Sequence, residues 1–182
     1  MRLFIAVAAD EKIKAAAVSA VARLRRAADG YRWVDPRDMH VTLRFLGEVA
    51  DEKLPEIEAL MRRAAASAAP FELAYGGVGA FDSLEDPRVV WIGLSGGTAP
   101  MEALTKILER DEPRPYAPHL TLGRRKGEAF PPEFVAALKS EPALALARPV
   151  EKLSLYASRP APFGHAYEIL TEIPLTGVRP NT

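Results

Sequence analysis

The sequence has no cysteine and only three histidines among its 182 residues. Without cysteine, the chain has neither disulfide bonds nor metal sites built on thiolates. No apolar run reaches the ~18 residues that a helix needs to span a bilayer. The formal net charge is zero, from 24 basic and 24 acidic residues, whereas proteins that hold a long nucleic acid usually carry a basic excess. We therefore expect no membrane contact, and only short, local contact with any nucleic acid.

The composition otherwise suits a globular protein, since 48% of the residues are hydrophobic and 26% are charged. A chain of this length usually forms one domain. Near the N-terminus, the short apolar run LFIAVAA is followed at once by a charged segment, which favours a buried strand over a signal peptide. We expect a single domain over residues 1–182, monomeric and located in the cytoplasm.

Hydrophobic periodicity predicts a mixture of helices and strands. Apolar residues recur at helical spacing in four segments, 10–30, 51–69, 98–108 and 131–139. Apolar or β-branched runs bounded by turn residues predict strands at 3–7, 31–34, 39–47, 71–81, 88–94, 119–123, 144–147, 152–158 and 165–175.

Two of the three histidines occur in the same short motif, HVTL at 40–43 and HLTL at 119–122. Threonine accounts for only seven of the 182 residues, so chance is a poor explanation for a threonine two residues after both histidines. Each motif strand is followed by a helix and then by further strands. This order predicts an α+β fold of two intertwined lobes related by a pseudo-twofold axis, each with an antiparallel sheet and helices on its outer face, around a central cleft.

Side chains alternate along a strand, so His40, Thr42 and Arg44 are expected on one face of the first motif strand. The same alternation groups His119 with Thr121 on the second. If these faces meet across a cleft, two hydroxyls can donate to a phosphate between two imidazoles, one acting as a base and the other as an acid. Such a site needs no metal ion. The alternative is that both histidines are half-exposed strand residues and both threonines good β-formers; the duplication favours the catalytic interpretation.

The sequence resembles the 2H phosphoesterases, which carry two His-x-Thr/Ser motifs, and among them the RNA 2′,3′-cyclic phosphodiesterases, also called 2′–5′ RNA ligases. The resemblance extends over nearly the whole chain and rests on the stretches RLFIAV, WVDPRDMHVTLRFLGEV, RVVWIGL, YAPHLTLGRRK and LSLYASRPAPFGHAYEIL. It implies a bilobal fold, a site without metal or cofactor, and hydrolysis of a terminal 2′,3′-cyclic phosphate to a 2′-phosphomonoester.

The resemblance also implies a role for individual residues. His40 is expected to act as the general acid toward the 3′ oxygen and His119 as the general base for water, while Thr42 and Thr121 grip the phosphate. Arg124, five residues after His119, matches an arginine common in the family and is suited to stabilising charge on the phosphoryl oxygens.

Several residues near the motifs have two interpretations. Arg124 precedes Arg125 and Lys126, so the three can instead form a solvated basic turn or, with Arg44, a local basic path for RNA. Trp33 and Tyr116 precede the two motif strands and can stack on a base, an interaction that typically contributes ~1–3 kcal/mol.

The alternative for both aromatic residues is packing in the core. His165, the third histidine, lies beside a turn and has no threonine two residues on. We expect it at the surface, without a role. Gly123 stands where the family usually has alanine, and we expect this difference to be harmless.

The expected partners are RNA ends or small cyclic nucleotides. Other functions stay open on the sequence alone: reversible 2′–5′ RNA ligation, hydrolysis of another cyclic phosphate such as ADP-ribose cyclic phosphate, or nucleotide and RNA-end binding without catalysis.

Overall fold

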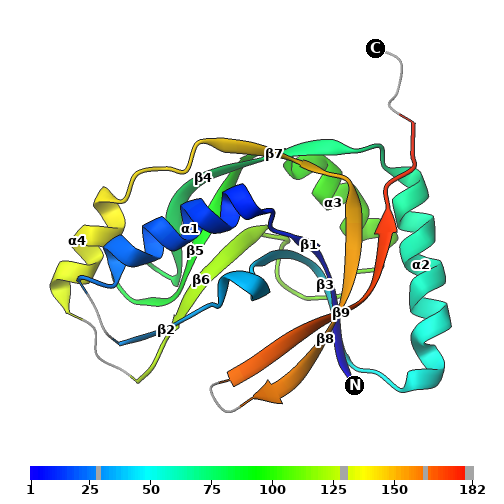
Figure 1. The fold of residues 1–182 in the computed structure, drawn as a ribbon, viewed down its shortest axis with the longest axis horizontal. Helices are drawn as coiled ribbons and strands as arrows, with labels where there is room; N and C mark the ends of the chain where they lie inside the picture. The colour runs from blue at the N-terminus through cyan, green and yellow to red at the C-terminus, as the bar shows by residue number, and fades with distance from the viewer. Residues whose placement is uncertain (28–29, 128–130, 162–163, 179–182) are drawn as a thin grey trace.

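A curled antiparallel sheet runs through the computed structural model, which describes residues 1–27, 30–127, 131–161 and 164–178 (Figure 1). The described residues form nine strands in this sheet, namely β1 (Arg2–Ala8), β2 (Tyr31–Trp33), β3 (His40–Glu48), β4 (Phe71–Asp82), β5 (Pro87–Gly96), β6 (His119–Arg125), β7 (Leu146–Val150), β8 (Lys152–Ala161) and β9 (Gly164–Pro174).

The sheet has two halves that meet at the motif strands. Its strand order is β7-β4-β5-β6-β3-β1-β8-β9, and β2 pairs with the far part of β6. The halves β7-β4-β5-β6 and β3-β1-β8-β9 are joined through the antiparallel pair Val41 and Leu120 of β3 and β6. The two predicted lobes are therefore confirmed, but their sheets are continuous.

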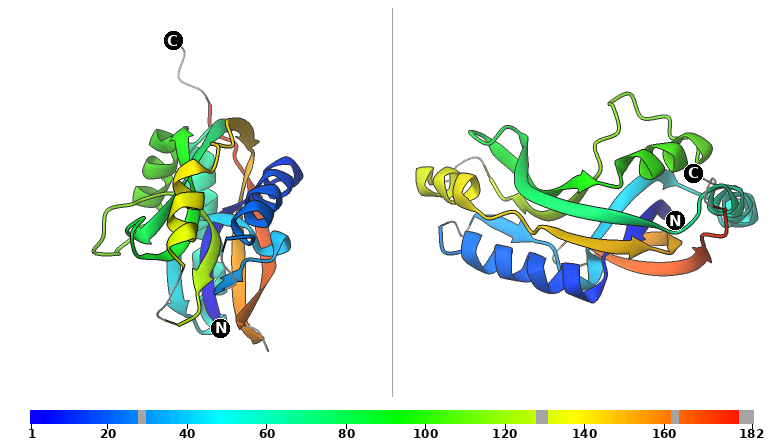
Figure 2. Two further views of the ribbon diagram at one scale, coloured as in Figure 1. Left: turned by 90° about the vertical axis from the view of Figure 1, so that its left-hand side faces the viewer. Right: turned by 90° about the horizontal axis from the view of Figure 1, so that it is seen from above.

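In the part of the chain that the structure describes, four α-helices pack on the two halves (Figure 2). The helices α2 (Leu54–Ser67) and α3 (Thr98–Ile107) pack on each other, with α2 against β8 and β9 and α3 against β3. The helices α1 (Glu11–Leu24) and α4 (Pro132–Ser140) contact each other, and α4 packs on β4. Since α1 follows β1 but lies beside α4, the chain crosses between halves. None of the helices among the described residues is long and apolar enough to cross a membrane.

The first helix shows how the local sequence determines these elements. The Asp10 side chain accepts a hydrogen bond from the backbone N–H of Ile13 at 3.0 Å and so caps the helix. A stripe at helical spacing, which includes Ile13, Ala17, Val21 and Leu24, is buried against the sheet. We predicted this helix to extend to Gly30, but α1 ends at Leu24, and residues 28 and 29 lie outside the described residues.

One predicted strand begins later than expected. The apolar segment 144–147 is not extended throughout, because Ala145 has a φ of 48°, in the left-handed region, and β7 begins at Leu146.

Strand β1 is buried on both faces, which explains its continuous apolar run. Leu3, Ile5 and Val7 belong to a main core that includes residues from both halves of the sheet. Phe4 and Ala6 point the other way and pack with Tyr156 and Tyr167 in a second cluster on the opposite face. That opposite face is the one that carries the motif histidines.

Candidate active site

The Val41–Leu120 pair determines how the two motifs meet. Because the register of an antiparallel pair advances in opposite directions, His40 lies next to Thr121 along this junction, and Thr42 lies next to His119. Each imidazole is therefore beside the threonine of the other motif. All four side chains line one cleft of about 580 Å³.

A β-bulge follows each motif threonine and changes which side chains face the cleft. In β3, Thr42 pairs with Ala6 but Arg44 pairs with Ile5, so Leu43 is the extra residue. In β6, Thr121 pairs with Trp91 but Gly123 pairs with Val90, so Leu122 is the extra residue. The fifth residue after each histidine is thereby brought to the cleft face: these residues are Phe45 and Arg124, and both line the cleft.

The bulge in β3 makes one prediction wrong. Simple alternation placed Arg44 on the same face as His40 and Thr42, whereas the bulge turns it to the opposite face. There, Arg44 donates a hydrogen bond from Nη1 to the backbone carbonyl of Leu108, just after α3. Arg44 therefore takes no part in a basic path along the cleft.

Two further residues of the predicted basic path, Arg125 and Lys126, also lie outside the cleft lining. Arg125 donates from Nη1 to a carboxylate oxygen of Asp86 at 2.6 Å, and Lys126 is exposed. Arg124, in contrast, is exposed and faces the cleft.

Both motif histidines are oriented by the same backbone contact. Nδ1 of His40 lies 2.5 Å from the carbonyl oxygen of Asp38, and Nδ1 of His119 lies 2.7 Å from the carbonyl oxygen of Ala117. A carbonyl oxygen can only accept a hydrogen bond, so Nδ1 carries the proton in each ring. The Nε2 atom is then the one that can exchange a proton with a substrate.

His40 lies against a cluster of aromatic rings. Its ring centroid is 4.7 Å from that of Phe4 and 5.4 Å from those of Tyr156 and Tyr167. Burial lowers the pKa of His40 to about 4, and positive charge on His119 and Arg124 acts in the same direction. In the free protein at neutral pH, this imidazole is therefore neutral.

His119 has a similar but less enclosed environment. Its ring meets the edge of Phe81 at a centroid distance of 4.9 Å and lies 6.1 Å from Trp91. Burial lowers the pKa of His119, and the positive charge of Arg124 lowers it further. A bound phosphate has the opposite effect, because its negative charge favours the imidazolium form of both rings.

The structure separates Trp33 and Tyr116 from the cleft. Neither side chain is part of the cleft lining. The Trp33 ring packs on Tyr31 and Phe134, in agreement with the core-packing interpretation. The Tyr116 hydroxyl donates to the backbone carbonyl of Thr42 at 3.0 Å and so supports the first motif strand.

Sequence reasoning missed several residues that line the cleft. They are the charged residues Arg2, Arg32 and Asp38 and the aromatic residues Phe4, Phe45, Phe81 and Tyr167. The signal for Phe45 was available in the alignment of HVTLRF with HLTLGR, where Phe45 occupies the position of Arg124. His165 is exposed as expected, but it also lies in the cleft lining, with Nδ1 3.1 Å from the Ser158 hydroxyl.

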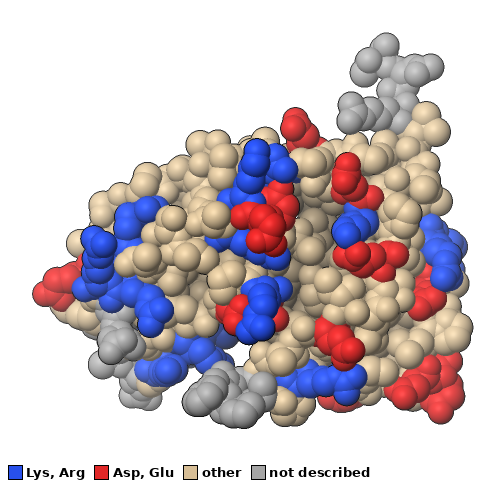
Figure 3. Space-filling view, viewed as in Figure 1, with Lys and Arg blue, Asp and Glu red and all other residues tan. Residues whose placement is uncertain are grey.

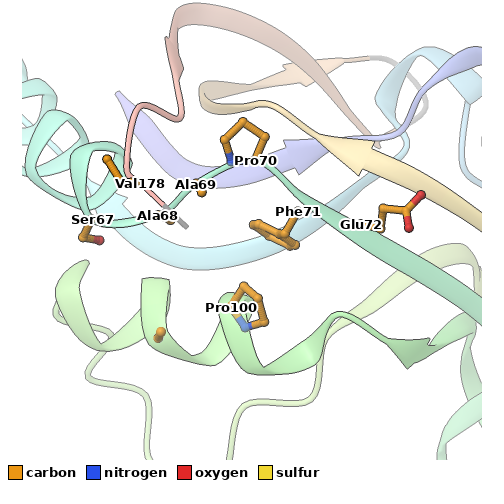
Figure 4. A pocket seen from close by; sticks show the side chains of 9 residues that line it. Ser67, Ala68, Ala69, Pro70, Phe71, Glu72, Pro100 and Val178 are labelled. Atoms are coloured by element: carbon orange, nitrogen blue, oxygen red, sulfur yellow. The ribbon is translucent and has the colours of Figure 1, made fainter. Parts of the chain in front are cut away.

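A second hollow in the molecule has no comparable chemistry. It measures about 460 Å³ and lies between the end of α2, the start of β4 and α3 (Figure 4). Its lining is mostly small or apolar and includes Ala69, Phe71, Pro100 and Val178, with Glu72 as its ionisable side chain. The histidine cleft is therefore the candidate active site.

A curled antiparallel sheet that brings two His-x-Thr motifs together on neighbouring strands in one cleft defines a phosphoesterase of the two-histidine class. The sequence profile of the LigT-like phosphoesterases matches residues 7–91, which contain the first motif. An RNA 2′,3′-cyclic phosphodiesterase of Thermus thermophilus is 34% identical over 192 aligned residues, which span 97% of this chain and 91% of that protein. The chain belongs to the LigT-like phosphoesterase family, as its motifs predicted.

Solved structures agree with this assignment. A crystal structure of a protein from Thermus thermophilus has a TM-score of 0.81 and 32% identity, covering 98% of this chain and 100% of that one. Escherichia coli LigT in complex with 3′-AMP has a TM-score of 0.76 and 28% identity, covering 96% and 98%. The predicted α+β fold class is confirmed by these matches.

Proposed function

We propose that this protein hydrolyses 2′,3′-cyclic phosphates at RNA ends to 2′-phosphomonoesters. The observation that carries the proposal is the antiparallel pairing of Val41 with Leu120, which brings the histidine and threonine of both motifs to one cleft. Relatives from Thermotoga maritima and Thermus thermophilus, both aligned over 97% of this chain, are named RNA 2′,3′-cyclic phosphodiesterases.

The reaction needs one proton acceptor and one proton donor on opposite sides of the phosphorus. In the proposed mechanism, Nε2 of His119 accepts a proton from water as the water oxygen bonds to phosphorus. The bond from phosphorus to O3′ breaks, and Nε2 of protonated His40 donates its proton to that oxygen. Thr42 and Thr121 donate hydrogen bonds to the non-bridging oxygens, and Arg124 stabilises the negative charge that they share.

The surroundings of His40 suit the role of acid. Burial lowers its pKa to about 4 in the free protein, so a proton on this ring is readily given up. The bound phosphodiester supplies the negative charge that holds the proton until the leaving oxygen needs it.

Phe45 is the side chain best suited to stack on a nucleobase. It lines the cleft next to the first motif, its centroid is 6.0 Å from that of Phe4, and 52% of its surface is exposed. An exposed aromatic ring beside a phosphate site is suited to base stacking. We propose Phe45 for this role in place of Trp33 and Tyr116. The same cleft would catalyse 2′–5′ ligation if an RNA 5′-hydroxyl took the place of water.

A short RNA ending in a 2′,3′-cyclic phosphate, incubated with the protein in EDTA, tests the proposal. Phosphorus NMR is expected to show a 2′-phosphomonoester as the product. His40→Ala and His119→Ala are each expected to reduce turnover by about 10²–10⁴-fold, the usual contribution of a positioned acid or base. Arg63→Ala, an exposed change on α2 away from the cleft, is the control and is expected to keep full turnover.

Several outcomes would contradict the proposal. A 3′-phosphate product would reverse the assignment of the leaving oxygen. Turnover that EDTA abolishes would require a metal ion. Nucleotide binding by folded protein without any turnover would indicate a binding protein, or an enzyme for another cyclic phosphate.

A further inference from the structure

Two arginines face each other at one end of the cleft. Arg32 on β2 pairs directly with Arg124 on β6, and both side chains line the cleft. Directly opposed residues of an antiparallel pair have Cβ atoms about 4.5–5.5 Å apart, and like charges at such positions destabilise a sheet. The stability of the sheet therefore does not explain this pair, whereas binding of an anion between the two guanidinium groups would.

Neighbouring carboxylates do not neutralise the pair. Among the described residues, no aspartate or glutamate lies within 4 Å of either guanidinium, and the nearby Asp86 pairs with Arg125 and Arg88. Asp38 is the one carboxylate found in the described cleft lining, and its carboxyl lies near the backbone of Tyr167, in the other half of the sheet. The Arg32–Arg124 end of the cleft therefore has a local positive charge in a molecule with no net charge.

The arginine pair lies beyond the two motifs along β6. One edge of β6 pairs first with β3 at Leu120 and then with β2 at residues 123–125. Along β6, His119 is followed by the junction with β3 at Leu120 and then by Arg124. Arg32 lies beside Arg124 on the neighbouring strand β2. Arg124 is thus the inner guanidinium and Arg32 the outer one.

The two ends of the cleft differ although the motifs are related. Phe45 and Arg124 occupy equivalent positions, each five residues after its histidine and each brought to the cleft by a bulge. At these two equivalent positions, one half of the cleft therefore offers an exposed aromatic ring and the other a guanidinium, while Arg2 and Phe81 line the cleft as well. A nucleotide at an RNA end has a base at one side and a chain of phosphates at the other, so the two positions suit different parts of it.

We propose that Arg32, acting with Arg124, binds a second phosphate, namely the 5′-phosphate that links the terminal nucleotide to the rest of the RNA. The proposal rests on the proposed function and adds to it that the cleft prefers an RNA end to a mononucleoside cyclic phosphate. A guanidinium suits this role because its planar donors match two phosphate oxygens.

Equilibrium binding tests the second-phosphate site without relying on turnover. Adenosine 2′-monophosphate and adenosine 2′,5′-bisphosphate are compared by calorimetry on the wild type, Arg32→Ala, Arg32→Lys and Arg63→Ala. The wild type is expected to bind the bisphosphate about tenfold more tightly, as a hydrogen bond to a charged group provides. Arg32→Ala is expected to lose most of this difference and Arg32→Lys part of it. Arg63→Ala, an exposed change on α2, is the control that keeps the difference.

Kinetics provide a second arm. A dinucleotide that ends in a 2′,3′-cyclic phosphate is compared with the same dinucleotide carrying an uncharged methylphosphonate linkage. The uncharged linkage and Arg32→Ala are each expected to reduce kcat/KM by about tenfold. Arg32→Ala assayed with the uncharged linkage is expected to show no further loss, because both changes remove the same interaction between Arg32 and the linking phosphate.

The outcomes separate this proposal from the proposed function. Equal affinity of the wild type for the two adenosine phosphates would overturn the second-phosphate site. Equal losses from Arg32→Ala with both dinucleotides would overturn it as well, and would place Arg32 on the reacting phosphate. If the wild type hydrolyses neither dinucleotide, the proposed function fails, while the binding arm still decides the second-phosphate site.

Discussion

At the scale of single residues, His40 and His119 are held by the same backbone contact, yet their surroundings differ. Each Nδ1 atom is bound to the carbonyl two residues earlier in the chain, so each Nε2 atom is the one that exchanges protons. His40 is enclosed by three aromatic rings, and burial brings its pKa to about 4. His119 is less enclosed, and its pKa is also lowered.

These pKa values predict a difference between two pH profiles. The kcat/KM profile reports the free protein and is expected to be bell-shaped with both limbs below pH 6.5, because burial lowers the pKa of both imidazoles. The kcat profile reports the bound state and is expected at higher pH, because the phosphate charge raises both pKa values. Steady-state kinetics from pH 4 to 9 measure both. A kcat/KM optimum above pH 7 would contradict the prediction.

The exposed ring of Phe45 allows a test of base stacking. Phe45→Ala is expected to raise KM by about tenfold, within the ~1–3 kcal/mol of a stacked base, and to change kcat little because the ring does not meet the reacting atoms. Phe45→Tyr should keep most of the affinity. A methyl riboside 2′,3′-cyclic phosphate, which has no base, is the control substrate. An equal loss with this substrate would show that Phe45 does not contact the base.

At the scale of strands and helices, the motif strands and the buried face of α1 were predictable, while the bulges were not. Periodicity within a segment reveals a buried stripe such as Ile13, Ala17 and Val21. A bulge depends on the register against a strand far away in the sequence, here β1 for β3 and β5 for β6. This is why alternation gave the wrong face for Arg44, while Arg124 was found through the family resemblance.

The close contact between β6 and β2 predicts a cost for any side chain larger than glycine at position 123. A Cβ added at Gly123 would lie 2.8 Å from Cε3 of Trp33. Gly123→Ala is therefore expected to destabilise the protein by about 1–3 kcal/mol, the usual cost of overpacking, and to displace β2 with Arg32. The expectation that glycine at this position is harmless stays a prediction, and the contact with Trp33 gives a reason why glycine fits here.

Urea unfolding measures the change in the free energy of unfolding caused by Gly123→Ala. Gly77→Ala on β4 is the control, because a Cβ there would have no other atom within 4 Å. Equal stability of Gly123→Ala and the wild type would show that the Trp33 ring moves aside at no cost.

At the scale of the whole molecule, two related halves were predictable but their connection was not. The repeated motif indicated two lobes around a cleft. The neighbouring positions of β3 and β6 and the packing of α1 beside α4 depend on contacts between distant segments, for which no local pattern exists. On the face shown in Figure 3, basic side chains gather on the left part, while acidic side chains are more frequent at the centre and right.

The two proposed phosphate contacts and the zero net charge predict a shallow salt dependence. Contact with the reacting phosphate and one further phosphate should give log KM a slope of about 1 to 1.5 against log salt concentration, at ~0.7 for each phosphate of a single strand. This slope is measured from the Michaelis constants of a short RNA and a long RNA at salt concentrations from about 50 to about 200 mM. A slope that steepens with RNA length would mean that more phosphates are bound than these two.

The pseudo-twofold relation between the motifs has a consequence for the shape of the reacting phosphorus. In an in-line displacement, phosphorus passes through a trigonal bipyramid whose entering and leaving oxygens are at the two apices. That figure has a twofold axis that exchanges the entering and leaving oxygens, and neither the cyclic ester nor the opened product has both of these oxygens bonded to phosphorus. In the proposed mechanism, the apical oxygens meet His40 and His119 and the equatorial oxygens meet Thr42 and Thr121. The symmetry of the protein then matches the transition state better than the substrate or the product, and this selective match is what accelerates a reaction.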